Sequence, residues 1–298
     1  MRTETYRREM KVSDYRITKE QRAYLDSLVC QRISDDPANK ATIEKFTNER
    51  SISLPAALKH GWNQDKKDKL AYYIVKEPGE DGEPLLFFSL KCGEITQSFN
   101  RDKLRTVLDN SEALLDAAYG KEAPEWAKEI VEKCKVNGEL SDEKFDEFYT
   151  RHLRNLIKWN SYITEIRQEG ENIILTKQTM PGVELVHFCD HWPAKLKWNA
   201  TAMGSRSMGR AMFWKFVVPV IQQVRDLVGC EYLYLFAADA KKNGRLVNYY
   251  TELGFEIRED LNVSKPEYDF GCFFMCQKVT SLRNRQKEFF RNYNNPFA

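Results

Sequence analysis

The sequence lacks several features that would place the protein in a specialised class. Its longest apolar runs, such as FVVPVI, are far shorter than the roughly 18 residues that a membrane span needs. The polar start MRTETYRREM predicts no signal peptide. The seven cysteines form no C-x-x-C pair, which favours reduced thiols in a cytoplasmic protein. The formal net charge is only +2, so overall charge does not predict binding to nucleic acid.

Strand-like and helix-like apolar spacing alternate along the chain. Runs of β-branched and aromatic residues predict a hairpin of 71–75 with 85–91, and helical spacing fills a long segment after it. No linker-like composition or internal repeat interrupts the sequence. We therefore expect one domain over 1–298, with an all-helical insertion at 97–167 and a C-terminal tail at 279–298.

The remaining elements predict a mixed α/β fold. Near the start of the chain we expect helices over 18–34 and 39–50. After the insertion we expect two short strands, NIILTKQT and ELVHFCD, separated by a turn at MPG, then a long loop and a helix from Met208 that Pro219 should kink. A buried strand CEYLYLFAADA, a helix that ends at Gly254 and the strands FEIRED and DFGCFFMCQKV should follow. The strand–helix–strand unit from 184 to 238 should form a parallel, right-handed crossover.

Small and basic residues gather at the expected helix start in GSRSMGRAMFWKF. The 35 residues between Asp190 and Asp226 contain no acid, but they contain Lys195, Lys197, Arg206, Arg210, Lys215 and Arg225. A helix start offers free N–H groups and about half a positive charge, and Gly209 lets a ligand approach the backbone closely. Residues 206–211 are therefore a candidate phosphate site. The alternative is a capped helix behind a solvated basic loop.

Two known phosphate-binding patterns fit this stretch poorly. GSRSMGRA has the glycine spacing of G-x-x-x-x-G-K-S/T, but Arg210 stands at the lysine and Ala211 has no hydroxyl for magnesium. The dinucleotide pattern G-x-G-x-x-G is absent. A nucleotide-binding protein of the P-loop type is therefore disfavoured.

A third pattern fits better. Residues 206–211, RSMGRA, match Q/R-x-x-G-x-G/A. After one helix and one strand, NGRLVNYYTELGF (243–255) matches N-x-x-A/L-x-x-L/F-Y-x-x-x-G-F, with Tyr249 where an aliphatic residue is more usual. In this order the two patterns resemble the GNAT family of N-acetyltransferases. The resemblance covers about 71–95 and 172–278, and it implies a mixed, mostly antiparallel central sheet flanked by helices.

The resemblance also implies acetyl-CoA as cosubstrate. In the family, the amides of the first pattern hold its pyrophosphate, a role that falls here on Arg206, Ser207, Met208, Gly209, Arg210 and Ala211. The pantetheine lies between two splayed strands, which places the thioester near Phe188 and Cys189. Asn243 would orient the acyl or pantetheine chain, or cap its helix. Tyr250 would protonate the leaving thiolate as general acid, or pack against the sulfur.

The general base follows less directly. Glu184 is the candidate from the resemblance, with His187, Asp190 and His191 nearby. His187, Cys189 and His191 could also suggest a metal site, but no fourth ligand is evident. We therefore expect no metal, and His187 is then an ordinary strand histidine.

The expected function is acetyl transfer from acetyl-CoA to a primary amine by direct attack in a ternary complex. We expect a small-molecule or peptide amine as acceptor rather than nucleic acid, and no membrane contact. The insertion and the aromatic tail would shape the acceptor pocket or a homodimer face. The alternative is a non-catalytic acyl-CoA-binding or interaction module with the same fold.

The loop from Cys189 to Arg206 is longer than the usual family turn, so either the strand continues into WPAKLKW or the loop covers the acceptor site.

Overall fold

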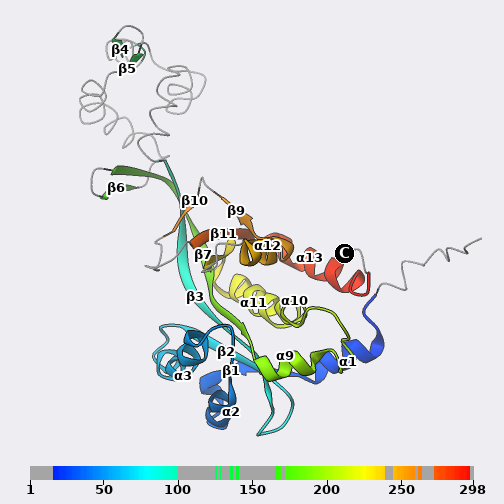
Figure 1. Cartoon of the computed structure of the whole chain (residues 1–298). Coiled ribbons are helices and arrows are strands. Elements are labelled where there is room, and N and C mark those ends of the chain that lie inside the picture. The colour runs from blue at the N-terminus through cyan, green and yellow to red at the C-terminus, as the bar shows by residue number, and fades with distance from the viewer. Residues whose placement is uncertain are drawn as a thin grey trace, which may run out of the picture. The chain divides into compact units, whose positions relative to one another are not determined.

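The protein is described from a computed structural model (Figure 1). The described residues are 16–99, 172–238, 244–258, 261–263 and 272–295, together with 125, 128, 135–136, 139–140 and 165–169. The chain forms two compact units: the first comprises Met1–Gly93, Pro181–Ile257 and Tyr268–Ala298, and the second comprises Glu94–Met180 and Arg258–Glu267.

The first unit is built on a mixed sheet with the strand order β1-β2-β3-β7-β8-β11-β9. In chain order these strands are β1 Val29–Arg32, β2 Ala71–Lys76, β3 Pro84–Phe99, β7 Asn172–Asp190, β8 Tyr232–Ala238, β9 Glu256–Ile257 and β11 Cys272–Lys278. The strand pairs whose register is described are antiparallel, except that β7 and β8 are parallel. The expected mostly antiparallel sheet, the β2–β3 hairpin and the parallel crossover are thus confirmed.

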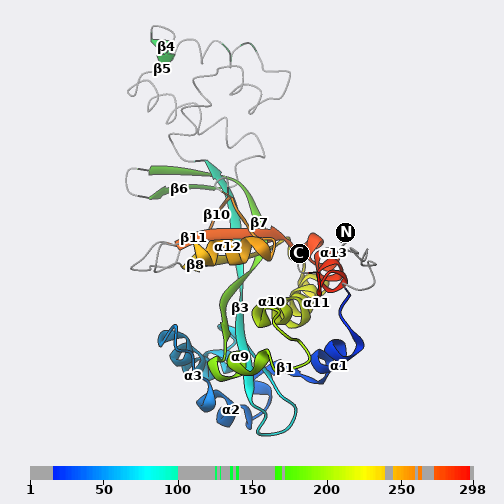
Figure 2. The ribbon, with the colours of Figure 1, turned by 45° about the vertical axis from the view of Figure 1, so that its right-hand side comes forward.

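Helices cover both faces of this sheet (Figures 1 and 2). They are α1 Lys19–Ser27, the 3-10 turn η2 Ile33–Asp35, α2 Asn39–Lys45, α3 Ser53–Lys66, α9 Trp192–Trp198, α10 Met208–Met212, the π-helical turn η4 Phe213–Val217, α11 Val218–Val228, α12 Arg245–Glu252 and α13 Val279–Arg291. Within the part of the chain that the structure describes, no helix is long and apolar enough to cross a membrane.

Among the described residues of the first unit, two buried cores lie on opposite faces of the sheet. Leu86 and Phe88 of β3 belong to the larger core, which also contains residues of α1 and of α9 to α13. Phe87, between them in sequence, belongs to a smaller core with Leu58 of α3 and Ile43 of α2. Because successive side chains of a strand point to opposite faces, the larger core defines what we call the α10–α13 face and the smaller core defines the α2–α3 face.

Pairing between distant strands overrides local signals in two places. The sequence predicts a turn at Met180-Pro181-Gly182, but β7 runs through it because Gly182 pairs with Tyr232 of β8. The sequence also predicts one helix over 18–34, but α1 ends at Ser27 and Val29–Arg32 pairs with β2.

The expected C-terminal tail at 279–298 begins as the helix α13.

The second unit contains short strand pairs. The start of β7 pairs with β6 Glu165–Glu169, the end of β3 pairs with β10 Leu261–Asn262, and β4 Lys135–Val136 pairs with β5 Glu139–Leu140. The prediction that the insertion at 97–167 is helical throughout is therefore wrong for its described extended residues. Glu125 and Lys128 are helical, and the rest of the insertion lies outside the described residues.

A buried carboxylate ties α3 to the sheet of the first unit. Asp65 accepts hydrogen bonds from Arg32 Nε and from the Tyr72 amide, both at 2.8 Å, and from the Ser34 amide at 3.1 Å. The Asp65 side chain is 0% exposed, whereas that of Asp68, which binds the same arginine at 2.8 Å, is 83% exposed. The two carboxylates therefore differ mainly in burial.

Asp65→Asn should lower the free energy of unfolding by about 3 kcal/mol, because the Arg32 guanidinium loses its buried counter-charge and an amide nitrogen faces a backbone donor. The matched change Asp68→Asn should cost less than about 1 kcal/mol. Chemical unfolding of both variants measures the difference. Equal losses would contradict this account of the α3 contact.

Candidate functional site

The expected phosphate site lies at the start of a long helical run, because α10, η4 and α11 follow one another without a break. Ser207 caps this run: its hydroxyl accepts from the Arg210 amide at 3.4 Å, and its carbonyl accepts from the Ala211 amide at 3.1 Å. Helix geometry leaves the amides of Met208 and Gly209 without an intrahelical acceptor. These two donors, and not the Ala211 amide, are therefore available to an anion.

The loop before this helix is fixed by a buried tryptophan. Trp198 of α9 donates from Nε1 to the carbonyl oxygen of Arg206 at 2.7 Å. The segment WPAKLKW is thus a helix rather than a continued strand or an open loop, and Pro193 sits in its first turn, where a missing N–H does no harm. This contact holds the backbone one residue ahead of the Ser207 cap.

Strands β7 and β8 pair only briefly. Their described parallel pairing runs from Gly182 with Tyr232 to Glu184 with Tyr234, and both strands continue beyond it. In β7, Leu185 and Phe188 both pack on the α10–α13 face although they are three residues apart. An extra residue between them, as in a β-bulge, accounts for this break in alternation.

A cavity of about 320 Å³ brings these elements together. It is lined by Arg50, Leu86, Phe188, Asp190, Lys195, Ser207, Gly209, Leu246, Tyr249 and Tyr250. Four expected site residues are among them: Phe188, Ser207, Gly209 and Tyr250. The cavity thus joins the helix start, the end of β7 and one face of α12 within the first unit.

Two adjacent tyrosines of α12 form the wall opposite the helix start. A Cβ added at Gly209 would lie 2.5 Å from Tyr249 Oη and 3.7 Å from the Phe188 ring, so the absence of a side chain at 209 makes room for the phenol. Tyr250 is buried with its ring 5.8 Å from that of Phe255, and burial raises the pKa of its hydroxyl. The Tyr250 phenol therefore stays protonated at neutral pH.

Most charges around the cavity are partnered. Asp190 accepts from Lys195 Nζ and from Asn48 Nδ2, the latter at 3.0 Å. Arg210 pairs with Glu252 of α12. Arg50 is exposed and lies 5.4 Å from the Trp192 ring, in a cation–π contact that leaves its donors accessible.

Glu184 lies on the other face of the sheet. Its neighbours Val183 and Leu185 belong to the core of the α10–α13 face, so the Glu184 side chain points away from the cavity. It accepts a hydrogen bond from the Tyr234 hydroxyl, and burial raises the pKa of the carboxyl while the nearby Lys91 opposes that rise. Glu184 and Tyr234 are also the last described pair before β7 and β8 separate.

His187 also lies on the α2–α3 face. Its Nδ1 is 2.7 Å from Ser89 Oγ, its ring stacks on Tyr72 at 5.7 Å, and burial lowers its pKa. His191 accepts the Thr47 amide at Nδ1, at 3.0 Å. Each histidine therefore has a protein partner. No group of His, Cys, Asp and Glu within the described residues is arranged to hold a metal ion.

Other expected residues lie near the cavity without lining it. Met208 and Ala211 have buried side chains, so only their backbone or packing could serve a ligand. Cys189 packs in the core of the α2–α3 face, where burial raises the pKa of its thiol to about 12. Arg206 is half-buried in the loop. Asn243 lies outside the described residues.

Several cavity residues have no signal in the two motifs. Arg50 lies far away in sequence, and Lys195 belongs only to the basic stretch between Asp190 and Asp226, whereas Leu246 stands at the A/L position of the second motif. Tyr249 did have a signal, because it is the position at which the second motif departs from the family pattern. Its contact with Gly209 links the two motifs directly.

Comparisons with known proteins give structural neighbours only. No family description and no curated protein matches the sequence. One similar solved structure is a tyrosine-to-phenylalanine mutant of KacT, with 13% sequence identity, coverage of 87% of this chain and 99% of that chain, and a TM-score of 0.44. A second is a tyrosine-to-phenylalanine mutant of the AtaT toxin bound to the C-terminus of the antitoxin AtaR and acetyl-CoA, with 11% identity, coverage of 87% of this chain and 98% of that chain, and a TM-score of 0.44. A third is AtaT complexed with acetyl-methionyl-tRNAfMet, with 14% identity, coverage of 87% of this chain and 98% of that chain, and a TM-score of 0.41. At this level the likeness concerns the fold, and function must be inferred from the cavity itself.

One expectation about partners is corrected by these neighbours. From the sequence we expect no nucleic acid as partner, but the similar structures include the complex with acetyl-methionyl-tRNAfMet and a KacTA–DNA complex. That expectation relied on the net charge of the whole chain, +2. Binding of a polyanion depends on how charge is distributed over the surface rather than on its sum.

Proposed function

We propose that the protein transfers an acetyl group from acetyl-CoA to a primary amine by direct attack in a ternary complex. The observation that carries this proposal is the cavity in which free amides at a helix start, the diverging end of β7 and the protonated phenol of Tyr250 meet. Each of these features suits a different part of the thioester.

The diphosphate would bind at the helix start. The amides of Met208 and Gly209 lack intrahelical acceptors, and the helix dipole adds a partial positive charge. Arg206 and Arg50 would supply further positive charge from the preceding loop and from the cavity wall. The missing side chain at Gly209 leaves room for the Tyr249 hydroxyl, which therefore lies beside the amides that would bind the phosphate oxygens.

The pantetheine would follow β7 toward the point where β7 and β8 separate. Beyond Glu184 the edge of β7 toward β8 is free of the described pairing, so its backbone groups are suited to pair with the two amides of pantetheine. Phe188 lines this path in the cavity, and Cys189 would contribute its backbone only.

The amine nitrogen would attack the thioester carbonyl carbon, and the C–S bond would break as the amide forms. The sulfur would leave as thiolate and take the proton of the Tyr250 hydroxyl, which burial keeps protonated. The phenolate would then recover a proton from solvent or from the amine through the site. Tyr250 thus serves as general acid.

The amine would approach from the α2–α3 face. Glu184 sits there at the last paired position of β7, and its raised pKa suits a general base that must accept a proton near neutral pH. His187 is the rival base on the same face, because its lowered pKa keeps the imidazole neutral. If acetyl-CoA binds but no amine is acetylated, the non-catalytic acyl-CoA-binding module is the better account.

Acetyl-CoA at about 100 times its dissociation constant should stabilise the protein by roughly 2.7 kcal/mol. Gly209→Asp should abolish the rise in Tm that acetyl-CoA causes, because its carboxylate would repel the diphosphate and its Cβ would displace the Tyr249 hydroxyl. Leu227→Asp is the control: it adds the same charge at a position that is 83% exposed, near the far end of the same helical run. Thermal melts with and without acetyl-CoA test the pair, and a full shift in the Gly209 variant would place the diphosphate elsewhere.

Tyr250→Phe should lower kcat by about 10²-fold or more while leaving the Kd for acetyl-CoA within a few-fold. The neighbouring change Tyr249→Phe is the control for loss of a phenol from the same cavity, and it should keep most of kcat. Thiol release with a panel of amines, including amino acids, polyamines, peptides and aminoacyl-tRNA, measures the rate. An unchanged kcat in Tyr250→Phe would refute the acid role.

The pH profile should identify the base. A general base acts when deprotonated, so kcat/KM should fall as pH drops through the pKa of Glu184, which burial raises above 4.5. Glu184→Gln should remove this acidic limb and slow the reaction by about 10²-fold. The matched variant His187→Asn should retain the limb. If the limb disappears only in His187→Asn, His187 is the base.

A further inference from the structure

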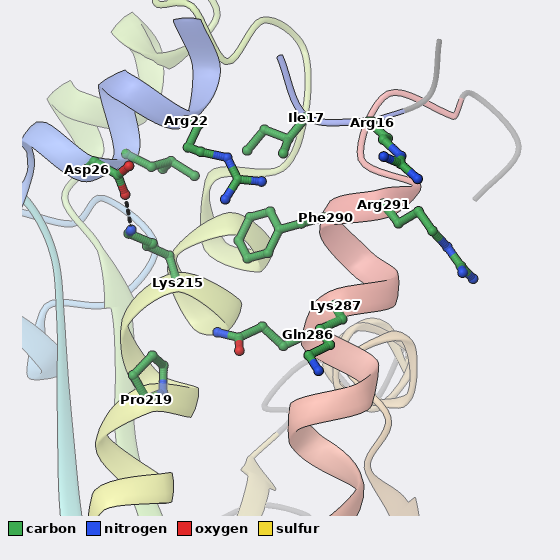
Figure 3. Close-up of a pocket in the computed structure, with 11 residues that line it drawn as sticks. Arg16, Ile17, Arg22, Asp26, Lys215, Pro219, Gln286, Lys287, Phe290 and Arg291 are labelled. Atoms are coloured by element: carbon green, nitrogen blue, oxygen red, sulfur yellow. Dashed lines mark hydrogen bonds and ion pairs between the residues drawn. The ribbon is translucent and has the colours of Figure 1, made fainter. Parts of the chain in front are cut away.

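A second and larger cavity lies away from the proposed active site. Its volume is about 530 Å³, and it lies between α1, the helical run at Lys215 to Pro219, and α13 (Figure 3). None of the residues lining it lines the cavity that contains Gly209 and Tyr250. We call it the basic cavity, because five of its lining residues are cations: Arg16, Arg22, Lys215, Lys287 and Arg291.

Only one of these cations is neutralised. Lys215 pairs with Asp26, the single acidic residue of the lining (Figure 3). Within the part of the chain that the structure describes, Arg16, Arg22, Lys287 and Arg291 form no ion pair. In a chain with nearly balanced charge, an unpaired cluster of this kind repels itself, and an anionic ligand would relieve the repulsion.

The walls of the basic cavity are fixed to each other. The Ile17 amide donates to the Phe290 carbonyl oxygen at 3.0 Å, and Asn294 Nδ2 donates to the Arg16 carbonyl oxygen at 2.7 Å. Gln21 of α1 also donates from Nε2 to Asn294 Oδ1 at 3.1 Å. The segment before α1 is therefore tied to the end of α13, and the cations stand on a preformed frame.

The cationic groups are spread along the cavity rather than gathered at one point. In Figure 3 the Arg22 guanidinium projects into the middle, the Arg16 and Arg291 side chains reach outward at the α13 side, away from Arg22, and Lys287 lies near the lower end. Lys287 and Arg291 are four residues apart on α13, so they share one helix face. A single phosphate needs converging donors, whereas this arrangement suits an anion with several charges along its length.

An aromatic ring completes the lining. Phe290 is half-buried and projects into the cavity between Arg22 and Gln286 (Figure 3). It is held from behind by Phe289, at 5.1 Å between ring centroids. A positively charged groove with an aromatic platform is the combination that binds single-stranded nucleic acid, since phosphates meet the cations and a base can stack on the ring.

We infer that the basic cavity binds the phosphate backbone of single-stranded nucleic acid. An acidic peptide has the charge but no flat base to use the Phe290 ring. An anionic membrane meets a flat or convex surface, whereas these cations line a concavity. The inference stands independently of acetyl transfer, because it uses none of the residues of the proposed active site.

The test measures binding of a fluorescein-labelled single-stranded RNA 20-mer to the full-length protein by anisotropy at several salt concentrations. The variant combines Arg22→Gln, Lys287→Gln and Arg291→Gln. The matched control removes three exposed lysines elsewhere, Lys59→Gln, Lys66→Gln and Lys67→Gln. Acetyl-CoA-dependent thermal shifts of both proteins check the first cavity, and circular dichroism checks folding.

The variant should bind at least about tenfold more weakly, and its slope of log K against log salt should be shallower by about 2, as expected for three lost phosphate contacts at roughly 0.7 each. The control should bind like wild type. Phe290→Leu should weaken binding several-fold without changing the salt slope, because stacking does not release counter-ions.

Four outcomes would overturn the inference: no RNA binding by wild type, equal losses in variant and control, polyglutamate binding as tight as RNA, or preferential binding to anionic vesicles. Loss of the acetyl-CoA shift in wild type, with RNA binding intact, would count against the proposed function and leave this inference standing.

Discussion

The separation of β7 from β8 after Glu184 and Tyr234 is the constraint on which the candidate active site depends. If the two strands stayed paired to their ends, no gap would exist beside the helix start, and the Phe188 side chain could not lie close to Gly209 in the cavity. A break in the alternation of β7 turns Phe188 to the cavity. The same break leaves His187 on the opposite face, where Ser89 holds it. One irregular strand thus supplies groups to both sides of the sheet.

The helix start is held in that gap by packing that is encoded locally. Trp198 holds the Arg206 carbonyl oxygen, and the buried residues Phe213 and Val217 anchor the helical run to the sheet. The π-helical turn η4 ends at Val217, two residues before Pro219, so the chain adapts to the missing proline N–H without ending the helix. Buried apolar residues therefore fix the position of two free amides that are themselves polar and accessible to a ligand.

Much of this arrangement could be predicted from the sequence. The hairpin of β2 and β3, the helix start at Ser207 and the glycine end of α12 each follow from local signals, and Gly254 has φ +90° as that end requires. Features set by distant pairing could not be predicted. The Met180-Pro181-Gly182 segment looks like a turn but is held extended by β8, and Arg50 reaches the cavity from a remote segment. The basic cavity could not be predicted from the balanced net charge, because four of its five cations come from the two ends of the chain and the fifth, Lys215, is distant from both in sequence.

The central claim is that the amide at Gly209 binds a diphosphate, and NMR of the protein labelled with ¹⁵N only at its 14 glycines tests it most directly. Loss of one signal in Gly209→Ala assigns that amide. On titration with CoA, the Gly209 amide proton should move downfield and show one of the largest shifts in the spectrum, because it gains a charged hydrogen-bond acceptor. If CoA binds and the Gly209 signal stays in place while other glycines shift, the diphosphate lies elsewhere and the account of the site is wrong.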